Sequence, residues 1–208
     1  MAIGFAERRA WQNRTKARES SKEKMMPIAP LVNDAAIRVV DSVRVVPTLR
    51  GAFAVVGSIG AFGAIAAAGM ALTPTWFESV ARYTPGQAPS IGMVARVFVV
   101  PSLVEEMLWR VILQPPTMHW GTCVLVNAVF AFPYHWTVGA IAGGEAARTF
   151  RHPVFGGMAF LLGNLCSFSY RNASFGAWAP VVVHGILVSI WLTTFDGEAI
   201  LLGEENGD

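Results

Sequence analysis

The chain alternates long apolar stretches with short polar ones, and several of the apolar stretches are long enough to cross a bilayer. A helix needs about 20 apolar residues to span a hydrocarbon core of roughly 30 Å. The pattern predicts five spans, at residues 51–72, 91–113, 121–142, 153–168 and 174–194. We therefore expect an all-α membrane protein, a polytopic helical bundle of about five transmembrane helices.

Both ends of the chain are polar. Residues 1–26 carry mixed charges, which predicts a solvated tail rather than a nucleic-acid-binding or targeting segment. Residues 34–46 place apolar side chains at helical spacing opposite charged ones, which is typical of a helix lying on the membrane surface. The predicted organisation is a basic tail with this interfacial helix at residues 1–50, a helical bundle at 51–195 and an acidic tail at 196–208.

Composition supports the membrane assignment and predicts an orientation. The chain is 53% hydrophobic and 14% charged, well below the charge of an ordinary soluble domain. Lys and Arg are concentrated before the first span, which predicts a cytosolic amino terminus. Arg148 and Arg151, in a predicted polar loop at residues 143–152, then lie outside the cytosol, against the same rule. Cys123 and Cys166 lie in apolar stretches and indicate neither a disulfide nor a metal pair.

The second predicted span carries three ionisable residues, Glu105, Glu106 and Arg110. Such groups are costly at bilayer depth and usually line a polar cavity with a function. On a helix, Glu106 and Arg110 share a face in the favourable order for an ion pair. Glu105 points about 100° away and has no partner within the segment, so it is the candidate general base. The alternative is that all three form a structural polar network between helices.

Two histidines in other spans lie at a depth comparable to that of Glu105. At 1.5 Å per residue, Glu105, His135 and His184 are each roughly 15 to 21 Å into their spans, so they can converge. A single membrane histidine more often makes interhelical hydrogen bonds, but three such residues at one level favour a site. The fitting chemistry is water activation, with Glu105 as base, His135 holding the water and His184 donating to an oxyanion. The same trio could bind a divalent metal such as zinc, so the cofactor stays open.

Two sequence motifs resemble those of a known family. The run from Glu105 to Arg110 resembles the Glu-Glu-x-x-x-Arg motif of the CAAX protease and bacteriocin-processing family of intramembrane endopeptidases. The segment ending in His135 is similar to the Phe-x-x-x-His motif of this family. The spacing differs by one, because Phe130 is five residues before His135 and Phe132 is three. A proline between them could reset the helix and absorb the difference.

A third motif extends the resemblance and contains a departure from it. Residues 171–184, ending in His184, are similar to the last motif helix of the family and the turn before it. The likeness covers about residues 98–195, and the order and gaps of the motifs strengthen it. The family usually has Asn or Asp four residues after its last histidine, where this chain has Val188. If the absent group is an oxyanion donor, its loss costs on the order of a hundredfold in rate.

The resemblance implies a helical membrane fold with an active site that opens toward the cytosol. It also implies peptide hydrolysis, in some members removal of the last three residues of prenylated CAAX proteins. In this chain Glu105 and His135 would activate water, His184 would serve the oxyanion, and Glu106 with Arg110 would support the site. The expected partners are the lipid bilayer and a peptide or prenylated protein substrate, with no nucleic acid.

Two further functions remain open at this stage. Val188 favours a catalytically silent relative that acts as a membrane scaffold or confers immunity to a peptide toxin. A transporter with an intramembrane proton relay would use the same carboxylate and histidines. The five predicted spans show no repeated half, which disfavours the transporter.

Overall fold

The computed structural model describes residues 28–83 and 90–202, and every regular element in these two ranges is helical. The predicted tail at residues 1–26 and the acidic residues 203–208 lie outside the described residues. The chain divides into two units, with the boundary after Ile37. All of the elements that form the cavity described below belong to the second unit.

Helix α2 (Ile28–Arg44) contains most of the predicted interfacial segment and begins six residues before it. Within the first unit it exposes Leu31, Val32 and Ile37. In the second unit its continuation exposes Val40 and Val43. An amphipathic helix with exposed apolar side chains fits the expected position at a membrane surface, which stays a prediction.

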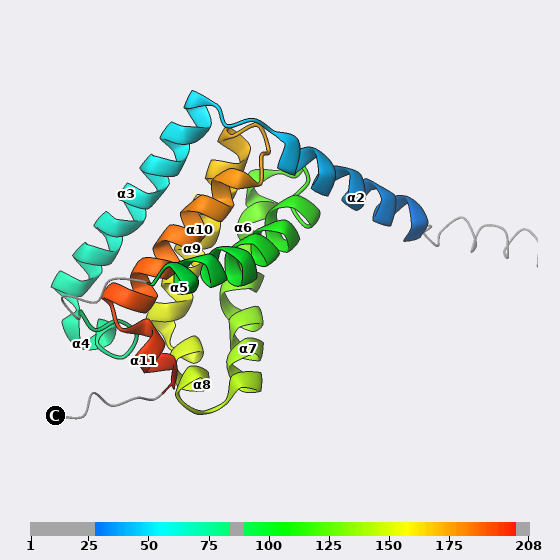
Figure 1. Ribbon diagram of the computed structural model, residues 1–208. Helices are drawn as coiled ribbons and strands as arrows, with labels where there is room; N and C mark the ends of the chain where they lie inside the picture. Colours follow the sequence, from blue (N-terminus) through cyan, green and yellow to red (C-terminus); the bar gives the residue numbers. More distant parts are fainter. Residues whose placement is uncertain (1–27, 84–89, 203–208) are drawn as a thin grey trace, which may run out of the picture. The chain divides into compact units, whose positions relative to one another are not determined.

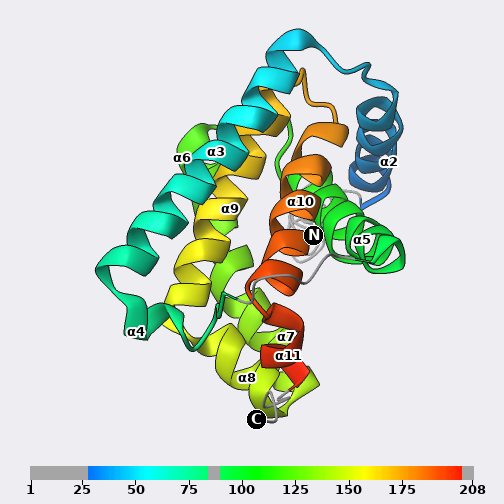
Figure 2. The same ribbon diagram turned by 60° about the vertical axis from the view of Figure 1, so that its left-hand side comes forward.

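Three helices form the frame of the second unit: α3 (Leu49–Leu72), α9 (Pro153–Asn172) and α10 (Trp178–Thr194). Each of the three packs against the other two, and they lie side by side in Figures 1 and 2. The buried cluster between them consists of Val55, Leu162, Cys166, Ala173, Ala179, Val183 and Leu187. Small residues in this cluster allow the helices to approach closely.

The predicted span at residues 91–113 is an interrupted helix. It contains α5 (Ile91–Val97) and the π-helices η1 (Phe98–Val104) and η2 (Met107–Ile112). Pro101 lies inside η1 and has no N–H to donate to the Val97 carbonyl. The Ser102 hydroxyl donates to this carbonyl instead, at 2.9 Å. Such π-helical turns occur frequently at functional sites, and Glu105 and Glu106 lie between these two.

The predicted span at residues 121–142 is also interrupted, by the π-helix η3 (Phe130–Tyr134) between α6 (Trp120–Val129) and α7 (His135–Ala142). Two of the described helices are long and apolar enough to cross a membrane, Leu49–Leu72 and Trp120–Ala142. Helix α10 is apolar but shorter. The number of five spans and their topology remain predictions.

Three segments that the sequence predicted as loop, turn or tail contain helix. The predicted loop at residues 143–152 contains α8 (Gly144–Arg151), in which the side chains of Glu145 and Arg148 pair at 2.7 Å. Opposite charges three residues apart stabilise a helix, so the polar composition of this segment is compatible with a helix as well as with a loop. Helix α9 continues through the predicted turn as far as Asn172, and α11 (Gly197–Leu202) occupies part of the predicted acidic tail. The remaining short helix, α4 (Pro74–Phe77), follows α3.

Gly139 on α7 makes the close approach of α8 possible and provides a test of this packing. A Cβ atom at Gly139 would lie 2.9 Å from the Phe150 Cβ and 3.2 Å from the Ala146 carbonyl oxygen. Both atoms are fixed by the backbone, so Gly139→Ala is expected to cost about 1–3 kcal/mol through overpacking. Gly57→Ala is the matched control, since a Cβ there meets nothing within 4 Å. Thermal unfolding in detergent micelles should show a lower Tm for Gly139→Ala alone, and equal Tm values would contradict this packing.

Candidate active site

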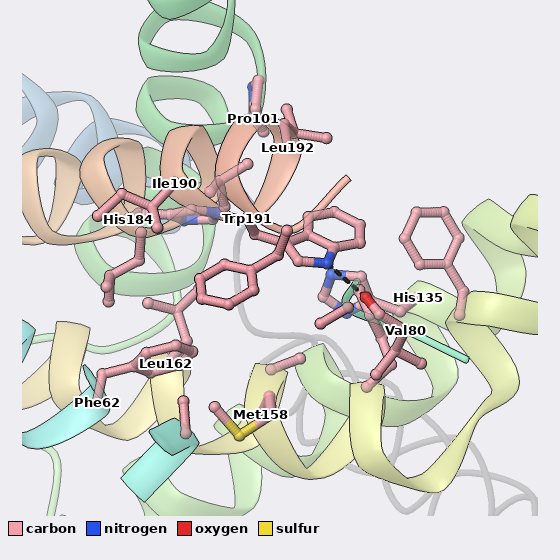
Figure 3. Close-up of a pocket in the computed structure, with 18 of the residues that line it drawn as sticks. Phe62, Val80, Pro101, His135, Met158, Leu162, His184, Ile190, Trp191 and Leu192 are labelled. Atoms are coloured by element: carbon pink, nitrogen blue, oxygen red, sulfur yellow. Dashed lines mark hydrogen bonds between the residues drawn. The ribbon is translucent and has the colours of Figure 1, made fainter. Parts of the chain in front are cut away.

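A cavity of about 480 Å³ lies among α3, η1, η3, α7, α9 and α10. Its walls are mainly apolar, and Figure 3 shows several of the side chains that line it. The polar side chains that line it are Glu105, Tyr134, His135, His184 and Trp191. An apolar cavity with a few convergent polar groups is the usual form of a ligand or active site.

A buried chain of charged groups supports one end of this cavity. The Arg110 Nε atom lies 3.1 Å from Glu106 Oε2, and both side chains are 0% exposed. The other carboxylate oxygen, Glu106 Oε1, is 2.7 Å from His184 Nδ1. A carboxylate in an ion pair only accepts, so Nδ1–H donates, and the Nε2 atom of a neutral His184 carries the lone pair. Glu106 thus fixes the orientation of the His184 ring, and Arg110 neutralises Glu106.

Glu105 occupies a different environment from its neighbour. Its Oε1 atom accepts a hydrogen bond of 2.9 Å from the Tyr134 hydroxyl, and its Oε2 atom lies 3.8 Å from His184 Nε2. The Glu105 side chain is 17% exposed, whereas that of Glu106 is fully buried. Of the two adjacent carboxylates, one is therefore held in the interior and the other lines the cavity.

His135 also lines the cavity and is held by its own helix. Its Nδ1 atom is 2.7 Å from the Phe130 carbonyl oxygen, which can only accept. Nδ1 therefore carries the hydrogen, and Nε2 of the neutral ring is an acceptor. The imidazole also packs edge-on against the Phe130 and Phe155 rings, with centroids 4.7 and 5.3 Å away.

The π-helix η3 explains the one-residue difference in the Phe-to-His spacing. A π-helix repeats from residue i to i+5, so Phe130 lies above His135 on one face. Phe132, three residues before His135, packs against Phe160 instead. Pro133 lies within this turn, where the sequence suggested that a proline would reset the helix. Phe130 is the aromatic residue that accompanies the histidine.

One face of α10 contributes three side chains to the cavity. His184, Val188 and Trp191 are at positions i, i+4 and i+7, and all three line it. The Trp191 indole N–H donates to the Val80 carbonyl oxygen at 2.6 Å, as Figure 3 shows. Val188 places an apolar side chain where an Asn or Asp was expected. Trp191 was not predicted as a site residue from the sequence, although its helical spacing from His184 places both residues on one face.

Tyr134 is a second cavity residue that was not predicted as a site residue from the sequence. Its ring stacks on Phe130 at 5.7 Å and contacts Trp109 edge-on at 5.4 Å, which fixes its hydroxyl beside Glu105. A tyrosine in an apolar span usually finds a hydrogen-bond partner for its hydroxyl. Its position directly before His135 was the available signal.

The sequence left open a metal bound by Glu105, His135 and His184. Within residues 28–83 and 90–202, no group of three or more His, Cys, Asp or Glu side chains is placed to hold a metal ion. The arrangement of donors among these residues does not fit a metal centre.

The fold and the site define a class of protein in which an all-helical bundle encloses an apolar cavity lined by carboxylate and imidazole side chains. Residues 87–190 match the family model described as type II CAAX prenyl endopeptidase Rce1-like. The chain belongs to this family of membrane-embedded proteases, as its motifs predicted, and the all-α membrane fold is confirmed. No curated protein and no solved structure gives a match. The matched segment contains Glu105, His135, His184 and Val188 and ends immediately before Trp191.

Proposed function

We propose that this chain is an intramembrane endopeptidase that hydrolyses a peptide bond of a membrane-presented substrate with water activated by Glu105 and His135. The observation that carries the proposal is the 3.8 Å separation of Glu105 Oε2 and His184 Nε2 in the cavity wall. This separation exceeds a direct hydrogen bond, yet one oxygen atom can contact both groups at a distance of about 2.8 Å. An oxygen atom of the attacking water or of the substrate carbonyl can therefore contact both residues.

Each residue has a defined part in this reaction. Glu105 Oε2 takes a proton from water, and His135 Nε2 accepts the second water hydrogen as a hydrogen bond. The water oxygen forms a bond to the carbonyl carbon, whose π electrons move to the carbonyl oxygen. Protonated His184 donates its Nε2–H to this oxyanion while Glu106 holds Nδ1–H. When the C–N bond breaks, Glu105 transfers its proton to the departing amine and becomes a carboxylate again.

The cavity supports a substrate with a long apolar group. Beyond the polar residues its wall consists of hydrophobic side chains, including Phe62, Met158, Leu162, Ile190 and Leu192 (Figure 3). Its volume of about 480 Å³ falls within the range of roughly 300–1,000 Å³ found for ligand pockets. A prenylated CAAX-type tail has this chemistry, with an isoprenyl chain close to the peptide bond that is cut. We therefore include a prenylated peptide in the proposed substrate class.

The experiment that tests this function compares two peptides with the protein reconstituted in liposomes. A prenylated CAAX peptide should release its last three residues, with a kcat/KM at least about tenfold above that of the unprenylated peptide, because each buried CH₂ contributes about 0.8 kcal/mol. His135→Ala should lower kcat by about 10²–10⁴-fold, the usual contribution of an acid–base group. Mass spectrometry of the released tripeptide gives both rates. Cleavage that is unchanged in His135→Ala would contradict the assigned chemistry.

Val188 favours a second candidate, a catalytically silent member that acts as a membrane scaffold or immunity protein. Its side chain lines the cavity but cannot donate a hydrogen bond. The native chain and Val188→Asn distinguish the two proposals in the same assay. A scaffold should release no tripeptide in either form, whereas an enzyme weakened at this position should gain activity with Asn.

A further inference from the structure

The cavity is rich in acceptors and poor in donors. The Glu105 carboxylate has only acceptor atoms, and its Oε1 accepts from the Tyr134 hydroxyl. His135 and His184 each have Nδ1 in a hydrogen bond, which leaves Nε2 as an acceptor in the neutral ring. The Trp191 N–H is engaged by the Val80 carbonyl. His135 donates to the Phe130 carbonyl and His184 donates to Glu106 of the buried ion pair. Among the described side chains that line the cavity, the Tyr134 hydroxyl is the donor whose acceptor, Glu105, is the proposed general base.

This shortage of donors matters at the oxyanion. Acyl transfer usually relies on at least two hydrogen-bond donors aimed at the developing negative charge. His184 can supply one donor when it is protonated. The position one turn further along α10, from which a second donor could face the cavity, is Val188.

We infer that the Tyr134 hydroxyl is the second oxyanion donor of this site, in place of an amide at position 188. The inference rests on the proposed endopeptidase function. The hydroxyl lies 2.9 Å from Glu105 Oε1, and Glu105 Oε2 lies 3.8 Å from His184 Nε2. Both oxygens belong to one carboxylate, so the Tyr134 hydroxyl borders Glu105 at one oxygen and His184 Nε2 borders it at the other.

During the reaction the Tyr134 hydroxyl changes its hydrogen-bond acceptor from Glu105 to the substrate carbonyl oxygen. In the resting site it donates to the negatively charged Glu105. Once Glu105 has taken the proton from water it is neutral and a weaker acceptor, while negative charge develops on the carbonyl oxygen. The hydroxyl then donates to that oxygen and keeps its own proton throughout. Stacking of the ring on Phe130 and its contact with Trp109 limit the movement to a rotation of the O–H bond and a small shift of the ring.

The test is Tyr134→Phe, which removes the donor and retains the ring. We expect kcat to fall by about 10²–10³-fold, as it does when an oxyanion donor is removed, with KM changed less than about threefold. Tyr83→Phe is the matched control, because the Tyr83 side chain is exposed and is not among the residues that line the cavity. A kcat within twofold of the native value for Tyr134→Phe overturns the inference.

A double variant separates a donor role from a packing role. Asn introduced at Val188 offers an N–H from the same cavity wall. If the Tyr134 hydroxyl is an oxyanion donor, Val188→Asn should raise kcat at least tenfold more in the Tyr134→Phe background than in the native chain, because only that background lacks the hydroxyl. An equal gain in both backgrounds, or no gain in Tyr134→Phe, overturns the inference. Glu105→Gln is measured in the same preparation. If Glu105→Gln is inactive while Tyr134→Phe is fully active, the proposed function stands and only this inference fails. A native chain without activity overturns both.

Discussion

Glu105→Gln is expected to lower kcat by about 10³-fold or more while the protein stays folded. Glutamine keeps the size of the side chain, and its carbonyl oxygen can still accept the Tyr134 hydrogen bond. It cannot take a proton from water, so the contribution of a general base, about 10²–10⁴-fold, is lost. The Glu105 side chain is 17% exposed at the cavity wall, and the fully buried ion pair between Glu106 and Arg110 is left unchanged by this substitution.

The measurement is tripeptide release in liposomes, together with the Tm of each protein in detergent micelles. Glu198→Gln is the matched control, because Glu198 is 46% exposed and pairs with Arg96 at the surface. It should retain native turnover. Undiminished turnover in Glu105→Gln would remove Glu105 from the mechanism, whereas a large loss of Tm would assign it a structural role.

The parts of the site that could be predicted from sequence are those set by local helix geometry. Glu106 and Arg110 are four residues apart, so their pair follows from the helix alone. The same geometry directed Glu105 to a different face. The helical structure of the apolar stretches was predictable because apolar composition is itself local. The family resemblance came from motifs of this kind, in which spacing along the chain carries the signal.

Contacts between distant segments could not be obtained in this way. The hydrogen bond from Tyr134 to Glu105 joins residues 29 positions apart, and that from His184 to Glu106 joins residues 78 apart. Their formation depends on how the helices pack, which no single segment encodes. The π-helical geometry of η3 could not be predicted from the sequence either. It is established only by the packing of the Phe130 ring against the His135 ring, five residues later. The catalytic roles of Glu105, His135 and His184 remain predictions that the variants above test.

The buried pair between Glu106 and Arg110 gives the second large effect, on stability as well as activity. Arg110→Met is expected to lower the free energy of unfolding by about 3–5 kcal/mol, because it leaves the Glu106 carboxylate buried without its counter-ion. The guanidinium also packs over the Phe130 ring at 5.3 Å, a contact that methionine replaces only in part. Activity should fall in parallel, since Glu106 orients His184.

Denaturant unfolding in detergent micelles measures this effect, with Arg148→Gln as the matched control. Arg148 pairs with Glu145 three residues away, but its side chain is 81% exposed, so its loss should leave the midpoint unchanged. A second variant, Arg110→Met with Glu106→Gln, tests the cause. Because the neutral glutamine side chain needs no counter-ion, the double variant should be more stable than Arg110→Met alone. A double variant that is less stable than the single one would show that the loss comes from packing rather than from an unpaired buried charge.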